Sequence, residues 1–237
     1  MLKSKLDTDY LLKWLNKTDS GFKSRSKPLV ILSYATSLDG SITQIRGEST
    51  PISCDESTEA VHHIRAFCDA IMVGIGTVIS DNPRLSVRLV SGDNPIPIII
   101  DTNLRTPLDS QLARENSNTI IFSGHSPDKH KKEQLESKGV LVIESPKTER
   151  GLSFSQILNE LYARGIRSLM VEGGAEIFRS FFLEELWDKI AVTVAPVFLG
   201  GYNLIEADTL ISTQRFKSVK WMSAGTDQIC LIDKDTV

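Results

Sequence analysis

From residue 29 onwards, short apolar segments alternate with longer segments whose apolar residues recur at helical spacing. The apolar segments are rich in β-branched residues, as is typical of strands, and lie at residues 29–35, 70–75, 96–101, 119–122, 140–143 and 168–171. Helical patterns lie between several of them, at residues 55–67, 127–138, 154–164 and 175–186. Strands that are apolar on both faces fit a parallel sheet that helices cover on both sides. The alternation therefore predicts an α/β fold with a mostly parallel central sheet.

The end of the chain follows a different pattern. Residues 189–197 resemble one long strand, and strand patterns at residues 216–223 and 228–233 follow without a helical segment between them. Antiparallel strands can be joined by a short turn, whereas parallel strands need a longer crossover. We therefore expect a C-terminal antiparallel hairpin at the edge of the sheet.

Residues 1–27 precede the alternation and are expected to form an N-terminal appendage. Leu11, Leu12 and Leu15 follow helical spacing, and Thr8 or Asp9 is in position to cap such a helix. A polar stretch at residues 21–27 then leads to Pro28. We expect a short docked helix followed by a linker, with a partner-binding helix as the alternative. Residues 28–237 are expected to form a single domain.

Charge and composition restrict the classes of partner. The 237 residues carry a formal net charge of −3, whereas proteins that bind nucleic acid through its phosphates need a basic surface. No apolar run approaches the roughly 20 residues of a membrane span, and charged residues interrupt the first apolar ones, unlike in a signal peptide. The three cysteines are widely spaced, which favours a reducing compartment. These features predict a cytoplasmic protein that binds neither nucleic acid nor membranes.

A Gly-Gly pair, Gly173-Gly174, lies where the strand at residues 168–171 gives way to a helical pattern. Glycines allow close backbone approach to a ligand, and a helix N-terminus offers N–H donors to phosphate. The dinucleotide fingerprint Gly-x-Gly-x-x-Gly is absent, so a tight turn without a ligand is an equal alternative. Glu172, at the carboxyl end of the strand, is either an acceptor for substrate hydroxyls or a solvated loop carboxylate.

Two arginines are candidates for holding a phosphate ester. Arg65 lies near the end of one helical pattern and Arg88 follows the next strand, and guanidinium groups match phosphate oxygens. Singly, each is more often a surface charge. Asp39-Gly40 reads as a turn, so we expect a structural role for Asp39.

The sequence offers no pattern for metal or nucleophilic chemistry. His62 and His63 are adjacent and so point in different directions on a helix, and His125 and His130 lie in a polar segment. Cys-x-x-Cys, Gly-x-Ser-x-Gly and the zinc deaminase signature are missing. We expect no metal site.

Taken together, the ordered motifs resemble the reductase domain of riboflavin biosynthesis, the carboxyl-terminal half of a bifunctional deaminase–reductase that also occurs as a stand-alone enzyme. The resemblance covers roughly residues 28–235, and the motifs that carry it are Ser37-Leu38-Asp39-Gly40, Gly47-Glu48-Ser49, Ile64-Arg65-Ala66, Gly76-Thr77-Val78, Asp81-Asn82-Pro83, Val87-Arg88, Ile100-Asp101, Val171-Glu172-Gly173-Gly174 and Ala195-Pro196-Val197-Phe198-Leu199-Gly200.

The resemblance implies a dihydrofolate-reductase-like fold, NADPH as hydride donor, a homodimer, and reduction of the ribosyl group of a ribosylamino-pyrimidine 5′-phosphate to a ribityl chain. The residues that it implies for the substrate are Ser49, Arg65, Leu85, Arg88 and Glu172. Those that it implies for the cofactor are Ala35, Thr77, Asp81, Thr102, Gly173, Gly174, Ala175, Glu176, Ile177 and Phe178.

Several points remain open at this stage. The proton donor is Glu172 or water, and Arg105 is a candidate cation for the 2′-phosphate of NADPH. Pro51 stands where the bifunctional bacterial enzymes tend to carry tryptophan beside the cofactor. The resemblance does not extend to the deaminase half, so we expect no deaminase activity. Whether the pyrimidine is the diamino or the deaminated form is not decided.

Two alternative functions remain. One is another pteridine or pyrimidine reductase on the same fold, which for a pterin calls for a buried carboxylate on the helix at residues 55–67. The other is a catalytically silent NADPH-binding module with residues 1–27 as its partner-binding part.

Overall fold

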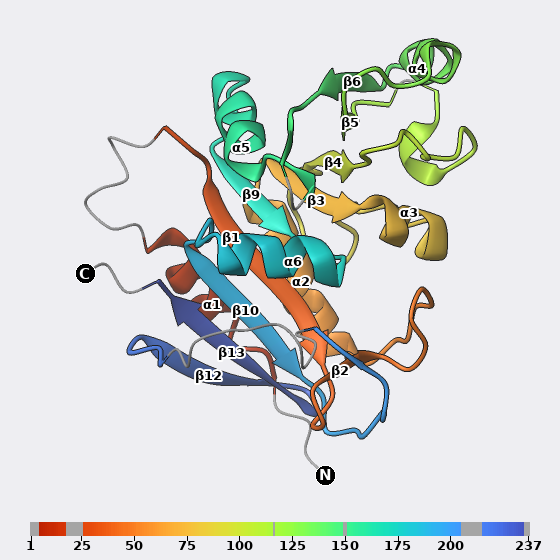
Figure 1. Cartoon of the computed structure of the whole chain (residues 1–237). Coiled ribbons are helices and arrows are strands. Elements are labelled where there is room, and N and C mark those ends of the chain that lie inside the picture. The colour runs from red at the N-terminus through yellow and green to blue at the C-terminus, as the bar shows by residue number, and fades with distance from the viewer. Residues whose placement is uncertain (1–4, 18–25, 116, 149–150, 205–214, 235–237) are drawn as a thin grey trace.

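The computed structural model describes residues 5–17, 26–115, 117–148, 151–204 and 215–234. Its centre is a nine-stranded sheet with the strand order β12-β13-β10-β1-β9-β3-β4-β5-β6 (Figure 1). These strands are β1 (Leu29–Thr36), β3 (Ala70–Gly74), β4 (Ile96–Ile100), β5 (Ile120–Ser123), β6 (Leu141–Glu144), β9 (Ser168–Val171), β10 (Lys189–Val194), β12 (Val219–Ala224) and β13 (Asp227–Asp233).

From β10 to β6, each strand is parallel to the next strand in this order. At the other edge, β13 pairs antiparallel with β10, and β12 pairs antiparallel with β13. The predictions of a mostly parallel sheet and a C-terminal antiparallel hairpin are confirmed.

Helices cover both faces of the sheet, as the sequence predicted. They are α1 (Thr8–Asn16), α2 (Asp55–Phe67), α3 (Ile75–Asp81), α4 (Lys129–Glu136), α5 (Phe154–Ala163) and α6 (Ala175–Leu183). The sheet separates two hydrophobic cores, and alternate residues of β4 belong to different ones. Ile99 belongs to the core beneath α1 and α2, whereas Ile98 and Ile100 belong to the core beneath α5 and α6. In Figure 1, α5 and α6 lie in front of the sheet and α2 lies behind it.

The N-terminal helix α1 packs against α2 and contributes to the main core. Leu11 and Leu15 are fully buried, whereas Leu12 is 38% exposed. The cap differs from the expectation of Thr8 or Asp9, because the carboxylate of Asp7 accepts the hydrogen bond from the backbone N–H of Tyr10 at 3.0 Å. The predicted linker falls largely outside the described residues.

Several short elements escaped the sequence patterns. The strand predicted over 70–75 ends at Gly74, and α3 begins at Ile75, because this helix is too short to show a helical repeat. Two small two-stranded sheets were also missed: β2 (Ser41–Thr43) with β11 (Tyr202–Asn203), and β7 (Lys147–Thr148) with β8 (Gly151–Leu152). Strands of two or three residues are too short for a detectable alternation.

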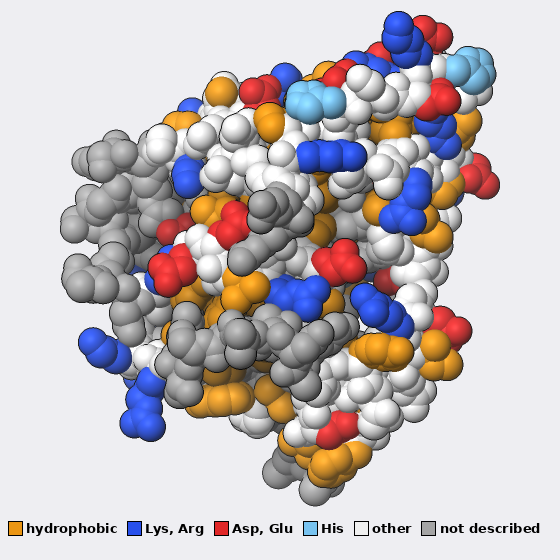
Figure 2. Space-filling model, viewed as in Figure 1, with side chains coloured by type: hydrophobic (Ala, Val, Ile, Leu, Met, Phe, Trp, Pro, Cys, Tyr) orange, Lys and Arg blue, Asp and Glu red, His pale blue; other side chains and the backbone are white. Residues whose placement is uncertain are grey.

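Within the described residues, no helix has the length and apolar character that crossing a membrane requires. Figure 2 shows basic and acidic side chains interspersed on the face that is turned toward the viewer.

Candidate active site

A pocket of about 640 Å³ opens at the carboxyl ends of the parallel strands β1, β9, β3 and β4. Open α/β sheets bind their ligands at this edge, and the volume is typical of a small-molecule or cofactor site. Its lining comprises Ser33–Ala35, Ile42, Thr43, 46–50, 75–77, Ser80, Asp81, Ile100, Thr102, Asn103, Arg105, 172–179 and 202–204.

The Gly-Gly pair forms part of the wall between β9 and α6. Gly174 adopts a φ of +83°, a conformation that favours glycine, and it precedes the first residue of α6. A Cβ atom on Gly173 would lie 3.3 Å from the hydroxyl oxygen of Thr77. The glycines therefore let the β9–α6 junction approach α3 closely and keep the backbone accessible from the pocket.

All ten residues that the resemblance implied for the cofactor line this pocket. They come from four places in the chain: Ala35 from β1, Thr77 and Asp81 from α3, Thr102 from the loop after β4, and residues 173–178 from the β9–α6 junction. Pro51 is exposed and is not among the lining residues. The structure thus brings together residues that are far apart in the sequence.

The implied substrate residues separate into two groups. Ser49 and Glu172 line the pocket, whereas Arg65, Leu85 and Arg88 do not. Leu85 is buried in the core and has a φ of +53°. Arg65 instead contacts the lining residue Glu172. Its Nε donates to Oε2 of that carboxylate at 2.7 Å, and its Nη2 donates to Oε1.

Arg65 and Arg88 donate hydrogen bonds to the same backbone carbonyl. Nη1 of Arg65 donates to the oxygen of Ser86 at 3.2 Å, and Nη1 of Arg88 donates to the same oxygen at 3.3 Å. The side chain of Arg65 is only 11% exposed, whereas Arg88 is an exposed residue. The sequence suggested two equivalent guanidinium groups, but the structure gives Arg65 a carboxylate partner and leaves Arg88 facing solvent.

His62 supports the segment that carries Arg88. Its buried imidazole Nδ1 accepts the backbone N–H of Arg88 at 2.9 Å. Burial lowers the pKa of His62 to about 4, and the nearby charges of Arg65 and Arg88 add to this effect. The imidazole is therefore neutral at pH 7, as an acceptor must be.

A flap formed by β2, β11 and residues 44–50 borders the pocket. Asp39 fastens its base by accepting hydrogen bonds from the backbone N–H groups of Leu199 at 3.0 Å and Gly200 at 2.7 Å. The hydroxyl of Ser37 also donates to Asp39, and these hydrogen bonds hold the pKa of Asp39 well below its usual range. The turn-like, structural role that the sequence suggested for Asp39 agrees with these contacts.

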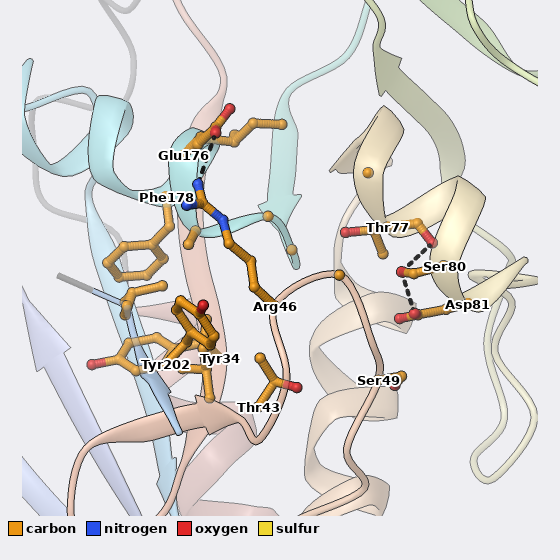
Figure 3. Close-up of a pocket in the computed structure, with 18 of the residues that line it drawn as sticks. Tyr34, Thr43, Arg46, Ser49, Thr77, Ser80, Asp81, Glu176, Phe178 and Tyr202 are labelled. Carbon is orange, nitrogen blue, oxygen red and sulfur yellow. Dashed lines mark hydrogen bonds and ion pairs between the residues drawn. The ribbon is translucent and has the colours of Figure 1, made fainter. Parts of the chain in front are cut away.

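Tyr34 is a lining residue that the sequence analysis missed. Its ring packs edge-to-face on Phe178, with 4.7 Å between the ring centroids (Figure 3). Burial raises the pKa of the Tyr34 phenol to about 12, so the phenol stays protonated at neutral pH. The only signal in the sequence was its place near the carboxyl end of the first strand.

The acidic residues at the start of α2 lie outside the pocket lining. These residues are Asp55, Glu56 and Glu59. Glu56 instead reaches the tip of the C-terminal hairpin, where its carboxylate lies against Gly225. No carboxylate of α2 lines this pocket, whereas a pterin site calls for one on this helix.

Comparison with protein families matches residues 28–230 to the family described as RibD C-terminal domain. The chain belongs to the RibD C-terminal domain family. The resemblance to riboflavin-pathway reductases that the motifs indicated is therefore confirmed.

Several relatives of this RibD C-terminal domain chain are named reductases. The 2,5-diamino-6-ribosylamino-4(3H)-pyrimidinone 5′-phosphate reductase of Aquifex aeolicus is 38% identical, over 82% of this chain and 87% of its own length. The protein of the same name from Archaeoglobus fulgidus is 30% identical over 84% of this chain and 95% of its own length. The riboflavin biosynthesis protein RibD of A. aeolicus is 35% identical, and the match covers 78% of this chain but only 51% of RibD.

Solved structures of riboflavin biosynthesis proteins have the same fold. RibD of Acinetobacter baumannii superposes with a TM-score of 0.76 at 26% identity, over 91% of this chain and 60% of that chain. The riboflavin biosynthesis reductase of Saccharomyces cerevisiae gives a TM-score of 0.73 at 24% identity, over 96% of this chain and 99% of its own. The predicted fold class is confirmed.

Proposed function

We propose that this member of the RibD C-terminal domain family catalyses NADPH-dependent reduction of the ribosyl group of a ribosylamino-pyrimidine 5′-phosphate to a ribityl group. The observation that carries the proposal is one pocket at the sheet edge that holds Glu172 and the complete set of residues implied for the cofactor. Because the relatives matched over most of their length are named reductases of the diamino-pyrimidinone, we propose the diamino form as the preferred substrate.

The pocket residues fit a dinucleotide. Glycines at 173 and 174 keep side chains away from the wall beside α6, and the pocket runs from Tyr34 on β1 to Arg105 beyond β4. Arg105 is the cation that we assign to the 2′-phosphate of NADPH. Lys147 lies near the loop after β4 that also carries Arg105. A Cβ atom placed on Gly124 would be 3.4 Å from Nζ of Lys147 and 3.0 Å from the carbonyl oxygen of Thr102 in that loop.

Bound NADPH supplies the hydride, so the chain has mainly to orient the acceptor and exclude competing reactions. Glu172 is suited to accept hydrogen bonds from sugar hydroxyls, because Arg65 fixes its carboxylate and each oxygen retains a further acceptor position. The exposed guanidinium of Arg88, which shares the carbonyl oxygen of Ser86 with Arg65, is suited to bind the 5′-phosphate. We assign the proton to water, since both oxygens of Glu172 already accept hydrogen bonds from Arg65.

The assignment of Arg88 is tested with the phosphorylated substrate and its dephosphorylated riboside. Arg88→Ala should raise KM for the phosphorylated substrate by the equivalent of about 1.5–3 kcal/mol, the typical contribution of a hydrogen bond to a charged group. KM for the riboside should not change. The matched control is Arg84→Ala, an exposed arginine four residues earlier. Equal KM values for wild type and Arg88→Ala on the phosphorylated substrate would remove Arg88 from the site.

The effect of NADPH on thermal stability distinguishes a protein that binds this nucleotide from one that does not. A ligand that binds only the folded state raises stability, by about 2.7 kcal/mol at a concentration 100 times its dissociation constant. We expect NADPH to raise the melting temperature of the purified protein. If saturating NADPH leaves the melting temperature unchanged, both the reductase and the silent NADPH-binding module are ruled out. A shift without turnover would favour the silent module.

We further propose that the protein acts as a cytoplasmic homodimer. The support is the family resemblance, together with the charge and cysteine content of the chain. Light scattering of the purified protein should give twice the mass of one chain.

A further inference from the structure

Arg46 reaches from the flap across the pocket to helix α6. Its Nη2 atom lies 3.6 Å from Oε1 of Glu176, a residue of the first turn of that helix. Figure 3 shows the arginine between two groups of lining residues, with Tyr34, Phe178 and Tyr202 on one side and Thr77, Ser80 and Asp81 on the other. Arg46 therefore occupies the middle of the pocket, where its two halves meet.

The turn that carries Arg46 is held by hydrogen bonds. The hydroxyl of Thr43 donates to the carbonyl oxygen of Glu48 at 2.7 Å, and it lies 3.1 Å from the hydroxyl of Thr50. The backbone N–H of Gln44 donates to that same Thr50 hydroxyl at 3.2 Å. Because the backbone on both sides of the turn is tied together, Arg46 projects from a fixed base and only its side chain has to move when its partner changes.

The ion pair itself is weak enough to be exchanged. The side chains of Arg46 and Glu176 are 63% and 79% exposed, and exposed ion pairs of this kind contribute little to stability. A phosphate offers more charge than a carboxylate and matches the planar guanidinium equally well. An anionic ligand in the pocket would therefore take Arg46 from Glu176 at small cost.

We infer that Arg46 exchanges Glu176 for the diphosphate of the dinucleotide when the cofactor binds, and that Glu176 holds the arginine across the pocket until then. This inference rests on the proposed function. A dinucleotide carries its diphosphate at its centre and its rings at its ends, which matches a central cation between two groups of lining residues. Arg46 is thus a binding residue for the part that NADPH and NADH share, whereas Arg105 is assigned to the part that only NADPH has.

The test compares the dissociation constants of NADPH and NADH, measured by the fluorescence of the reduced nicotinamide, for wild type and variants. Arg46→Ala should weaken both cofactors by the same factor, on the order of tenfold, which corresponds to one charge-assisted hydrogen bond. Arg46→Lys should recover part of this loss because it keeps the charge. Glu176→Gln should bind both cofactors about two- to fivefold more tightly, because the competing carboxylate is gone. Raising the salt concentration should reduce these differences.

Arg84→Ala is the control and should bind both cofactors as wild type does. The melting temperatures of all variants without cofactor should match that of wild type, since the pair is exposed. Wild-type affinity of Arg46→Ala for both cofactors would overturn the inference and leave the proposed function intact. A loss confined to NADPH would move Arg46 to the 2′-phosphate and also overturn it. Failure of the wild-type protein to bind either cofactor would overturn the proposed function itself.

Discussion

Arg65 and Glu172 form an ion pair at the edge of the pocket, in which the guanidinium orients the carboxylate. The two residues are separated by 107 positions, and they meet because the end of β9 lies beside the end of α2. The pairing changes the expected role of Arg65 from a free phosphate ligand to the group that orients Glu172.

The pH dependence of stability should report the neutral state of His62. Its pKa is about 4 in the folded protein and near 6.5 in the unfolded chain, so protons bind preferentially to the unfolded chain between these values. The contribution of His62 is therefore fully present above pH 6.5 and is lost as the pH falls toward 4, by at most about 3 kcal/mol. The positive charges of Arg65 and Arg88 beside the imidazole act in the same direction as its burial.

Urea denaturation of wild type and His62→Gln from pH 4 to pH 8 measures this effect. Glutamine keeps an acceptor for the N–H of Arg88 but does not titrate, so the variant should lose less stability than wild type over the acid range. Parallel curves for the two proteins would show that His62 does not carry the proposed linkage.

At the scale of elements, α1 is docked on the sheet by buried contacts. Its inner side chains enter the main core, and the buried Nζ of Lys189 donates to the carbonyl oxygen of Trp14 at 2.9 Å and to Asp233 at 2.7 Å. The N-terminal helix is thus fastened to β10 and β13, at the antiparallel side of the sheet. We propose that residues 5–17 are part of the folding unit that begins at residue 28.

Two leucines on α1 provide a matched test of that proposal. Leu15→Ala removes a fully buried side chain and should lower the free energy of unfolding by about 2–5 kcal/mol. Leu12→Ala truncates a side chain that is 38% exposed on the same helix, and should cost about 1 kcal/mol or less. Chemical denaturation measures both. Near-equal, small losses would mean that α1 is an appendage whose docking contributes little.

Elements with a long periodic pattern were predictable, and short ones were not. The helical repeat over α2 gave its bounds at Asp55 and Phe67, and the apolar run of β9 gave Ser168–Val171. The flap strands β2 and β11 have two or three residues each and pair across a large separation in sequence, so the local pattern held no information about them. The partner exchange proposed for Arg46 depends on this flap, so the local sequence pattern could not predict it either.

At the scale of the whole molecule, the order of the strands determines where the site forms. β1, β9, β3 and β4 are neighbours in the sheet although they are scattered along the chain, and their carboxyl ends bring the motifs together in one pocket. The βαβ rhythm predicted the sheet, and the motif order predicted the family. Only the three-dimensional structure shows that Tyr34 and Arg46 line the pocket, because neither residue belongs to one of the sequence motifs.

The most direct test of the account is NADPH oxidation by the purified protein with the diamino and the deaminated ribosylamino-pyrimidine 5′-phosphates, measured side by side with mass analysis of the product. We expect turnover that depends on the substrate, a product with two more hydrogens than the substrate, and a higher kcat/KM for the diamino form. A higher kcat/KM for the deaminated form would correct the substrate and keep the reductase. NADPH binding without oxidation on either pyrimidine would contradict the central claim that this pocket reduces a ribosyl group.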